Sequence, residues 1–333
     1  MKLLVFGNGF DLWLGLPTKF SNYKKFLEKT KKYPNCYKLL CHIANANKDY
    51  EWNKLEDDMC KYFINMSCNN EPLISNVDYK NACDEKYISL KYWIEDIRAK
   101  YKKELEDLYS WLKNQCESKN IFIWSFNYIF TYYDHNNLIY THLINGSKYQ
   151  KRMVTQLHRI EMVNNVTCFA FGADNQYISK NIFCQIDDEK YKYLRRFCTK
   201  FYFFPINNNE AWPDMITEPK QWCYHDGLGL PCDLWLKYGL KEIYFLGFGF
   251  GTQDERYFLN DDKFNPFKYC NINYTYLKET EKSIIEFKIH EYQKCCESTH
   301  VIKAFRMDEL LKDIFGNDGY NELLKIKSNI EQI

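Results

Sequence analysis

The sequence predicts an α/β protein with a mostly parallel, doubly wound sheet that is flanked by helices and interrupted by a helical insertion. Short apolar runs alternate with helix-periodic segments of varied length, which is typical of such sheets. The first run, KLLVF at residues 2–6, is too continuously apolar for a sheet edge and predicts a buried strand. A long charged segment between the first two runs has helical periodicity and no convincing strand, so it predicts the insertion.

The segment TKFSNYKKFLEK, which follows the first strand, predicts a helix. Phe20, Tyr23 and Leu27 fall on one face of this helix, and its lysines form the solvated face. Thr18 is the expected N-cap, because a threonine hydroxyl can accept a hydrogen bond from the first turn of a helix.

The helical insertion or cap is expected at 35–118, between core segments at 1–34 and 119–333. Its clearest helix is EKYISLKYWIEDIRAKYKKELEDLYSWLK. The apolar residues of this segment recur at steps of three and four, so they are expected to form its buried face: Ile88, Tyr92, Ile94, Tyr101, Leu105, Leu108 and Leu112.

Strands are predicted again after the insertion, as short apolar runs that are mostly bounded by polar or glycine-bearing stretches. They lie at 121–126, 153–157, 166–171, 201–205, 242–248 and 300–305. Helix-like spacers separate several of them, which favours parallel pairing over hairpins.

The composition argues against several classes of protein. The 45 Lys and Arg residues nearly balance the 44 Asp and Glu residues, giving a net charge of +1, so nucleic acid is an unexpected partner and a membrane is not expected. No apolar run approaches the roughly 18 residues that span a bilayer. The N-terminal apolar run is too short for a signal peptide, so we expect a cytoplasmic protein.

The 14 cysteines are expected to be thiols, because disulfides are rare in the cytosol. The nearest metal-like cluster comprises His290, Cys295, Cys296 and His300, in IHEYQKCCESTH. Its spacing matches no standard zinc site, and adjacent cysteines fit one tetrahedral ion poorly. We therefore expect no metal.

Small, amide and imidazole groups follow five of the predicted strands. These groups are Gly7-Asn8-Gly9-Phe10-Asp11, Ser125-Phe126-Asn127-Tyr128, His158, Gly172-Ala173-Asp174, and Gly249-Phe250-Gly251 with Asp254. The carboxyl ends of the strands form the ligand crevice in open α/β sheets. The sequence therefore predicts a binding site at this edge.

The turn Gly7-Asn8-Gly9 has two interpretations. Glycines at the end of a first strand let backbone N–H groups approach a diphosphate without a Cβ clash. Alternatively, they make a tight turn that needs no ligand. Leu12 stands where the usual dinucleotide fingerprint has a third glycine, so a hydride-transfer enzyme is not supported.

Several of these residues also have simpler interpretations. Asp11 is expected to cap a helix or to contact a ribose hydroxyl rather than to act in catalysis. Asn127 could cap a strand-to-helix turn. Trp52 and Glu56 fall on one helical face at i and i+4, where packing and one hydrogen bond would explain them.

The segment GNGFDLWLGLPTKFSNYKKFL at 7–27 resembles the opening of the AbiH family of bacterial abortive-infection proteins, which defend against phage. Further matches, in the family's order, are WNKLE at 52–56, SFNY at 125–128 and LGFGFGTQD at 246–254. The resemblance implies a Rossmann-like, sirtuin-like sheet that binds NAD.

The resemblance also implies roles for individual residues. The first glycine turn would hold the ADP-ribose diphosphate, and Asn127 would order a water or the ribose. The residues expected to contact the nucleotide are Gly7, Asn8, Gly9, Phe10, Asp11, Ser125, Gly247, Gly249 and Asp254.

In the wider group of sirtuin-like proteins, a histidine serves as the base. Two segments of this sequence compete for that position. His158 keeps the histidine, with Arg159 in place of the following glycine, and Asn145-Gly146 keeps only the glycine. His158 is favoured because it ends an apolar strand and comes shortly before CFAFGAD. Gly249 also stands where a serine is usual.

Two functions therefore follow as expectations. The first is hydrolysis of NAD at the nicotinamide–ribose bond, restrained by the helical region, a homo-oligomer or a regulatory protein. The second is a sensor that binds NAD or ADP-ribose without chemistry and acts through a partner protein. The substitutions at Arg159 and Gly249 favour the second.

Overall fold

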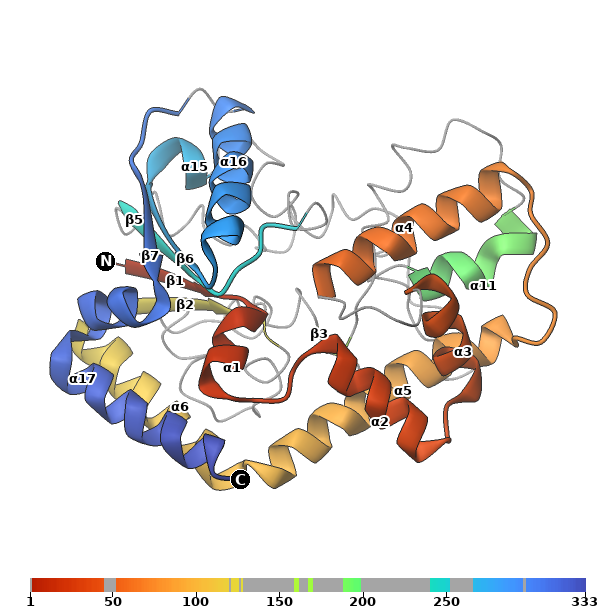
Figure 1. The fold of residues 1–333 in the computed structure, drawn as a ribbon, viewed down its shortest axis with the longest axis horizontal. Helices are drawn as coiled ribbons and strands as arrows, with labels where there is room; N and C mark the ends of the chain where they lie inside the picture. The colour runs from red at the N-terminus through yellow and green to blue at the C-terminus, as the bar shows by residue number, and fades with distance from the viewer. Residues whose placement is uncertain are drawn as a thin grey trace.

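The computed structural model describes residues 2–44, 52–119, 121–125, 127, 159–161, 167–169, 188–198, 240–251, 266–295 and 298–333. Within this part of the chain, five strands form one parallel sheet in the order β2-β1-β5-β6-β7 (Figure 1). These strands are β1 (Lys2–Phe6), β2 (Ile121–Ser125), β5 (Glu242–Leu246), β6 (Asn271–Tyr276) and β7 (Ile302–Arg306). The predicted parallel α/β sheet is thereby confirmed.

The order of the strands reverses beside β1. The chain passes from β1 to β2 on one side, and β5, β6 and β7 then follow on the other side. Ligands of open α/β sheets bind where the strand order reverses, outside the carboxyl ends of the strands. In this protein that place lies between the ends of β1 and β5.

Helices cover both faces of the sheet (Figure 1). One face packs against α1 (Asn8–Leu14), α6 (Lys102–Lys119) and α17 (Met307–Glu331), and the other against α15 (Pro266–Tyr269) and α16 (Glu279–Cys295). Leu4 and Phe6 of β1 belong to the first core, whereas Leu3 and Val5 belong to the second. Burial on both faces explains why residues 3–6 of the first strand are all apolar.

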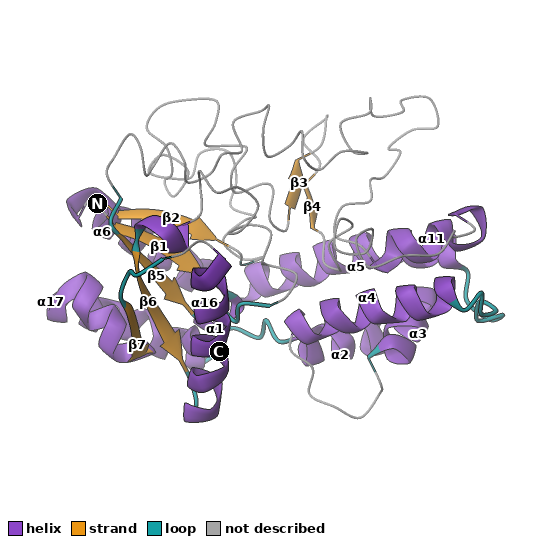
Figure 2. Ribbon diagram, turned by 90° about the horizontal axis from the view of Figure 1, so that it is seen from above, coloured by secondary structure: helices purple, strands orange, loops and turns teal. Residues whose placement is uncertain are grey.

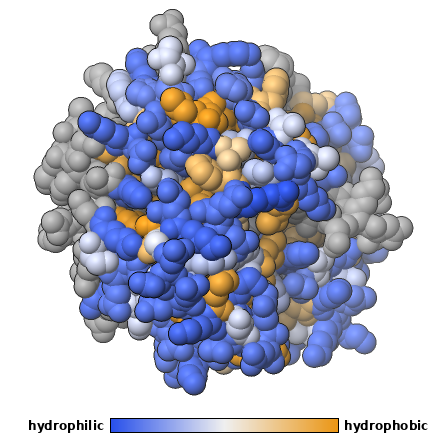
Figure 3. Space-filling view, turned by 60° about the vertical axis from the view of Figure 1, so that its left-hand side comes forward, coloured by the Kyte–Doolittle hydropathy of each residue, from blue (hydrophilic) through white to orange (hydrophobic). Residues whose placement is uncertain are grey.

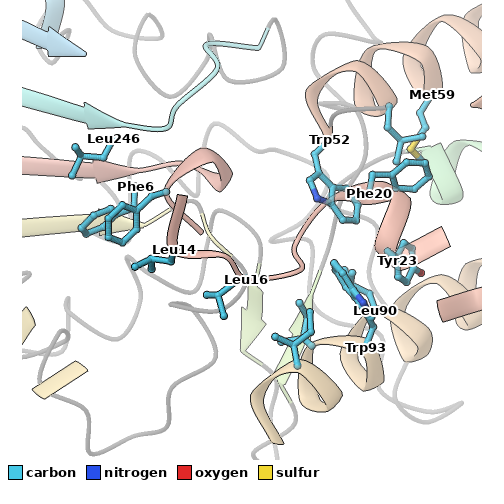
Figure 4. Close-up of a cluster of buried hydrophobic side chains, with 14 of the residues drawn as sticks. Phe6, Leu14, Leu16, Phe20, Tyr23, Trp52, Met59, Leu90, Trp93 and Leu246 are labelled. Carbon is cyan, nitrogen blue, oxygen red and sulfur yellow. The ribbon is translucent and has the colours of Figure 1, made fainter. Parts of the chain in front are cut away.

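A helical lobe lies beside the sheet (Figure 2). It contains α2 (Phe20–Thr30), α3 (Pro34–Ile43), α4 (Trp52–Cys68), α5 (Tyr79–Lys100) and α11 (Asp188–Cys198). Its core is continuous with one core of the sheet, because Leu14 and Leu16 lie between Phe6 and Trp52 (Figure 4). The predicted insertion at 35–118 stays a prediction. Helix α2, which precedes residue 35, lies in the lobe, whereas α6, which falls almost entirely within 35–118, packs on the sheet.

The strand predictions had several outcomes. The runs at 2–6, 121–126 and 242–248 correspond to β1, β2 and β5, and the run at 300–305 corresponds to β7. The run at 166–171 contains β4 (Thr167–Phe169), which pairs with β3 (Arg159–Glu161) in an antiparallel sheet of its own. The runs at 153–157 and 201–205 lie outside the described residues.

Strand β6 was missed because Asn271, Asn273 and Thr275 interrupt its apolar pattern. Asn273 and Thr275 are nevertheless buried, and their side chains donate to the carbonyl oxygens of Ile243 and Phe245 on β5. These hydrogen bonds make the polar side chains compatible with a buried strand.

The long predicted helix is two helices, α5 and α6, with a break at Tyr101. Ile94, Tyr101 and the three leucines of α6 are buried as expected. Ile88 and Tyr92 are 45% and 54% exposed, so their predicted burial is wrong. The buried face of α5 is centred on Leu90, Trp93 and Ile97. Ile88 and Tyr92 each lie two residues from Leu90, which is a rotation of about 200° around the helix axis, so they point away from this face.

The expected cap of α2 is also wrong. Lys19 is the N-cap residue of this helix, and it makes no side-chain cap. The Thr18 hydroxyl is buried and has no hydrogen-bond partner among the described residues. The Thr18 carbonyl accepts from the indole N–H of Trp52 at 2.7 Å. The predicted burial of Phe20, Tyr23 and Leu27 is confirmed.

A buried lysine joins two helices of the lobe. Lys86 of α5 is fully buried, and its Nζ donates to the carbonyl oxygen of Phe197 in the last turn of α11 at 2.6 Å. Carbonyls of a last turn lack partners within their helix, and the helix dipole favours a cation there. Burial lowers the pKa of Lys86 to about 8.

We predict that Lys86→Met changes how stability depends on pH. The pKa of Lys86 is about 8 in the folded state, against the ordinary 10.5. Protonation therefore favours the unfolded chain, and the stability of the wild type relative to Lys86→Met should rise between those pH values. Chemical unfolding of both proteins across this range tests the prediction. Lys80→Met, at an exposed lysine of α5, is the control, and a pH-independent difference for Lys86→Met would contradict burial of the amine.

Candidate functional site

The turn after β1 is hydrogen-bonded to the loop after β5. The N–H of Gly7 donates to the carbonyl oxygen of Leu246, and the N–H of Gly9 donates to that of Gly247, both at 2.9 Å. The N–H of Phe10 donates to the carbonyl oxygen of Gly7 at 3.0 Å. These three N–H groups are thus already bound within the protein.

The glycines allow this contact between two backbones. A Cβ on Gly9 would lie 2.7 Å from the Cα of Gly247, and a Cβ on Gly7 would overlap the Gly247 carbonyl oxygen. Gly247 has a φ of +62°, and a Cβ there would overlap the backbone nitrogen of Phe10. The loop after β5 therefore occupies the space that the two glycines leave open. The expectation that the N–H groups of residues 7–11 hold a diphosphate stays a prediction, and those of Gly7, Gly9 and Phe10 donate to backbone carbonyls.

Thr275 holds the other side of the same loop. Its hydroxyl oxygen accepts from the N–H of Gly247 at 2.7 Å, and the hydroxyl donates to the carbonyl oxygen of Phe245 at 3.3 Å. The carboxyl ends of β1, β5 and β6 are thus joined through Gly247. Thr275 was not predicted, although the alternation in NINYTY was a signal for the strand that carries it.

Asp11 and Asn127 meet at the carboxyl ends of β1 and β2. The Nδ2 of Asn127 donates to the Oδ1 of Asp11 at 2.8 Å, although the two residues are 116 positions apart. Asp11 is 0% and Asn127 is 1% exposed. The structure therefore brings the first glycine turn and Asn127 together, as the predicted site requires.

The environment of Asp11 is unusual for a carboxyl group. Burial raises the pKa of Asp11 well above its ordinary value, and the hydrogen bond from Asn127 opposes this more weakly. The Oδ2 of Asp11 is buried and has no hydrogen-bond partner in the described part of the chain. Asp11 is not the cap of α1, because Gly7 occupies the N-cap position without a side-chain cap.

Other predicted site residues lie around this pair. Asn8 is partly exposed at the start of α1, and Gly249 is exposed. Ser125 ends β2 opposite Phe6 of β1. Phe10 is fully buried and packs between Phe6 and Trp13, with ring centroids at 4.4 and 6.0 Å, so core packing accounts for it. His158, Asp254 and the segment Asn145-Gly146 lie outside the described residues.

Trp52 is accounted for by packing and one hydrogen bond, as expected. It is largely buried against Phe20 and Tyr23, and its indole N–H donates to Thr18. Glu56, one turn later in α4, is 5% exposed. These contacts join the segments GLPT and WNKLE inside the lobe.

No group of three or more His, Cys, Asp or Glu residues in the described part of the chain could hold a metal ion. Cys36 and Cys270 are buried outside any disulfide, and burial raises the pKa of each thiol to about 12. Such thiols are poor nucleophiles.

The described helices include none with the length and apolarity needed to cross a membrane. The face of the molecule in Figure 3 is mainly hydrophilic, with separate hydrophobic patches.

These features define a parallel α/β protein with a buried carboxyl–amide pair at the carboxyl ends of β1 and β2. The family model described as "Bacteriophage abortive infection AbiH" matches residues 3–276, and the chain belongs to this family of phage abortive-infection proteins. The match covers β1 to β6, so it includes Asp11, Asn127 and Thr275. Searches of curated proteins and of solved structures gave no significant match.

We predict that Gly247→Ala destabilises the protein. Its Cβ would overlap the backbone of Phe10, in a conformation that costs alanine energy. The expected loss in the free energy of unfolding is about 2–5 kcal/mol, from left-handed strain and overpacking. Chemical unfolding measures it, with Gly249→Ala in the exposed part of the same loop as the control. Equal stability of the two variants would contradict the backbone contact.

We also predict that Thr275→Val is destabilising although the side chains are nearly isosteric. Valine leaves the N–H of Gly247 without its acceptor, which should cost about 1–3 kcal/mol. Thr275→Ser keeps the hydroxyl and should retain most of the stability. Melting curves of both variants test this, and a valine variant as stable as the serine variant would contradict it.

Proposed function

We propose that this AbiH protein acts in abortive infection by hydrolysing NAD at the nicotinamide–ribose bond, on a Rossmann-like sheet of sirtuin-like type. The observation that supports this proposal is the contact between Asn127 and Asp11. It sets a buried amide and a buried carboxyl at the carboxyl ends of adjacent parallel strands, where such sheets bind nucleotides.

The chemistry needs little covalent machinery. Cleavage of the nicotinamide–ribose bond passes through an oxocarbenium-like state, so the protein has to position the substrate, exclude bulk water and place one water at the anomeric carbon. In the proposed site the amide of Asn127 orients this water or the ribose hydroxyls. His158 accepts a proton, for which an imidazole with a pKa near 6.5 is suited at neutral pH.

The diphosphate contact has to differ from the one that the sequence suggested. The N–H groups of Gly7, Gly9 and Phe10 donate to backbone carbonyls. Of the residues expected to contact the nucleotide, Asn8 is partly exposed and Gly249 is exposed. We therefore propose that Asn8 and Gly249 contact the diphosphate of the nucleotide and that Asn127 contacts the ribose.

A second candidate is a nucleotide sensor without catalysis. The internal hydrogen bonds of the glycine turn favour it, because they leave fewer groups to grip a substrate. Arg159 and Gly249 favour it as well, because they replace residues that are usual in the wider group. Such a protein would bind NAD or ADP-ribose and act through a partner protein.

Nicotinamide release from NAD tests the proposal. We expect release by the purified protein, and a loss of about 100-fold or more in Asn127→Ala and His158→Ala, the size typical of a missing positioning or proton-transfer group. Chromatography follows the product. Asn317→Ala and His300→Ala replace an exposed asparagine and an exposed histidine and should leave the rate unchanged.

The outcomes separate the candidates. Binding of NAD or ADP-ribose without turnover, in the presence and absence of phage infection, would favour the sensor. A protein that neither binds nor cleaves these nucleotides would contradict both functions.

A further inference from the structure

Asp11 is a buried carboxyl group with one bound and one unbound oxygen. Its Oδ1 accepts from Asn127, and its Oδ2 has no hydrogen-bond partner in the described part of the chain. Buried polar atoms are nearly always hydrogen-bonded, because an unbonded one loses its hydration without compensation. An unsatisfied carboxyl oxygen at the ligand-binding edge of a parallel sheet therefore needs an explanation.

Structural roles do not supply one. Asp11 does not cap α1, whose N-cap is Gly7. Burial and the hydrogen bond from Asn127 shift the pKa of Asp11, and no basic group of the described residues does. An asparagine could accept the same hydrogen bond from Asn127 without a buried acid. The carboxyl group thus brings a cost in stability and no structural benefit that the described residues show.

The position of Asp11 is closely fixed. The N–H of Gly9 is bound to Gly247, and the backbone carbonyl of Asp11 accepts from the N–H groups of Gly15 and Leu16. Asn127 then sets the rotation of the carboxyl group through Oδ1. A reactive group held in one orientation by its neighbours is what acid–base catalysis requires.

We propose that Asp11 is a catalytic residue of this site, with its Oδ2 accepting the proton of the attacking water while Asn127 holds Oδ1. This inference rests on the proposed function and deepens it. It assigns the proton of the water to Asp11.

The step balances as follows. The water oxygen forms a bond to the anomeric carbon, and one water proton moves to Asp11 Oδ2. The bond between the anomeric carbon and the nicotinamide nitrogen breaks, and its electron pair stays on nitrogen, so nicotinamide leaves uncharged. ADP-ribose remains, and the proton later passes from Asp11 to solvent.

The pH dependence follows from the same geometry. A base must be ionised, so the rate falls as the pH drops through the pKa of Asp11. Burial raises this pKa well above the ordinary value of an aspartate, so the acid limb of the kcat profile should lie closer to neutrality than that value. Asn127, the described residue whose side chain is hydrogen-bonded to Asp11, does not titrate.

Asp11→Asn tests the proposal. It keeps the shape and the hydrogen bond from Asn127 but removes the base. We expect kcat to fall by about 100-fold or more while KM changes only a few-fold, and the acid limb to disappear. The melting temperature should stay the same or rise, because a buried acid is lost. Asp318→Asn, at an exposed carboxylate of α17, is the matched control.

The results distinguish this inference from the proposed function. If the wild type releases nicotinamide and Asp11→Asn does so at an equal rate with the same acid limb, the role of Asp11 is overturned and the function stands. If the wild type releases none, both are overturned.

If Asp11→Asn does not fold, a carboxyl ¹³C NMR titration of the wild type decides. A midpoint for Asp11 that coincides with the acid limb of kcat supports the proposal. A midpoint at the ordinary aspartate value overturns it.

Discussion

The contact between the turn after β1 and the loop after β5 is the constraint on which the candidate site depends. Two hydrogen bonds of 2.9 Å join Gly7 and Gly9 to the β5 side, and the absence of Cβ atoms lets the two backbones meet. Because α1 starts directly after this contact, its position is set by the sheet. Asp11, in the first turn of α1, is therefore presented to the end of β2.

This arrangement gives the glycines a different role from the one that their spacing suggests. A Gly-x-Gly turn after a first strand usually brings backbone N–H groups to a phosphate. In this chain the same groups bind the protein's own backbone, and the polar character of the edge comes from the pair Asp11–Asn127.

Local patterns were sufficient to predict much of the fold. Strand β1 could be predicted from its apolar run, and the buried face of Phe20, Tyr23 and Leu27 from helical periodicity. Both patterns are local, so they can be read directly from the sequence. Strand β6 was missed because its polar residues are satisfied by β5, a neighbour that the local sequence does not reveal. The partner of the glycine turn and the orphan oxygen of Asp11 could not be predicted either, since both depend on contacts between distant segments.

A crystal structure of the protein with ADP-ribose, the product that keeps both the ribose and the diphosphate, tests the central claim most directly. The account predicts that the ribose lies against the amide of Asn127 and the Oδ2 of Asp11, beyond the carboxyl ends of β1 and β2. ADP-ribose bound elsewhere on the molecule, or bound at this edge without contact to Asp11, would contradict it.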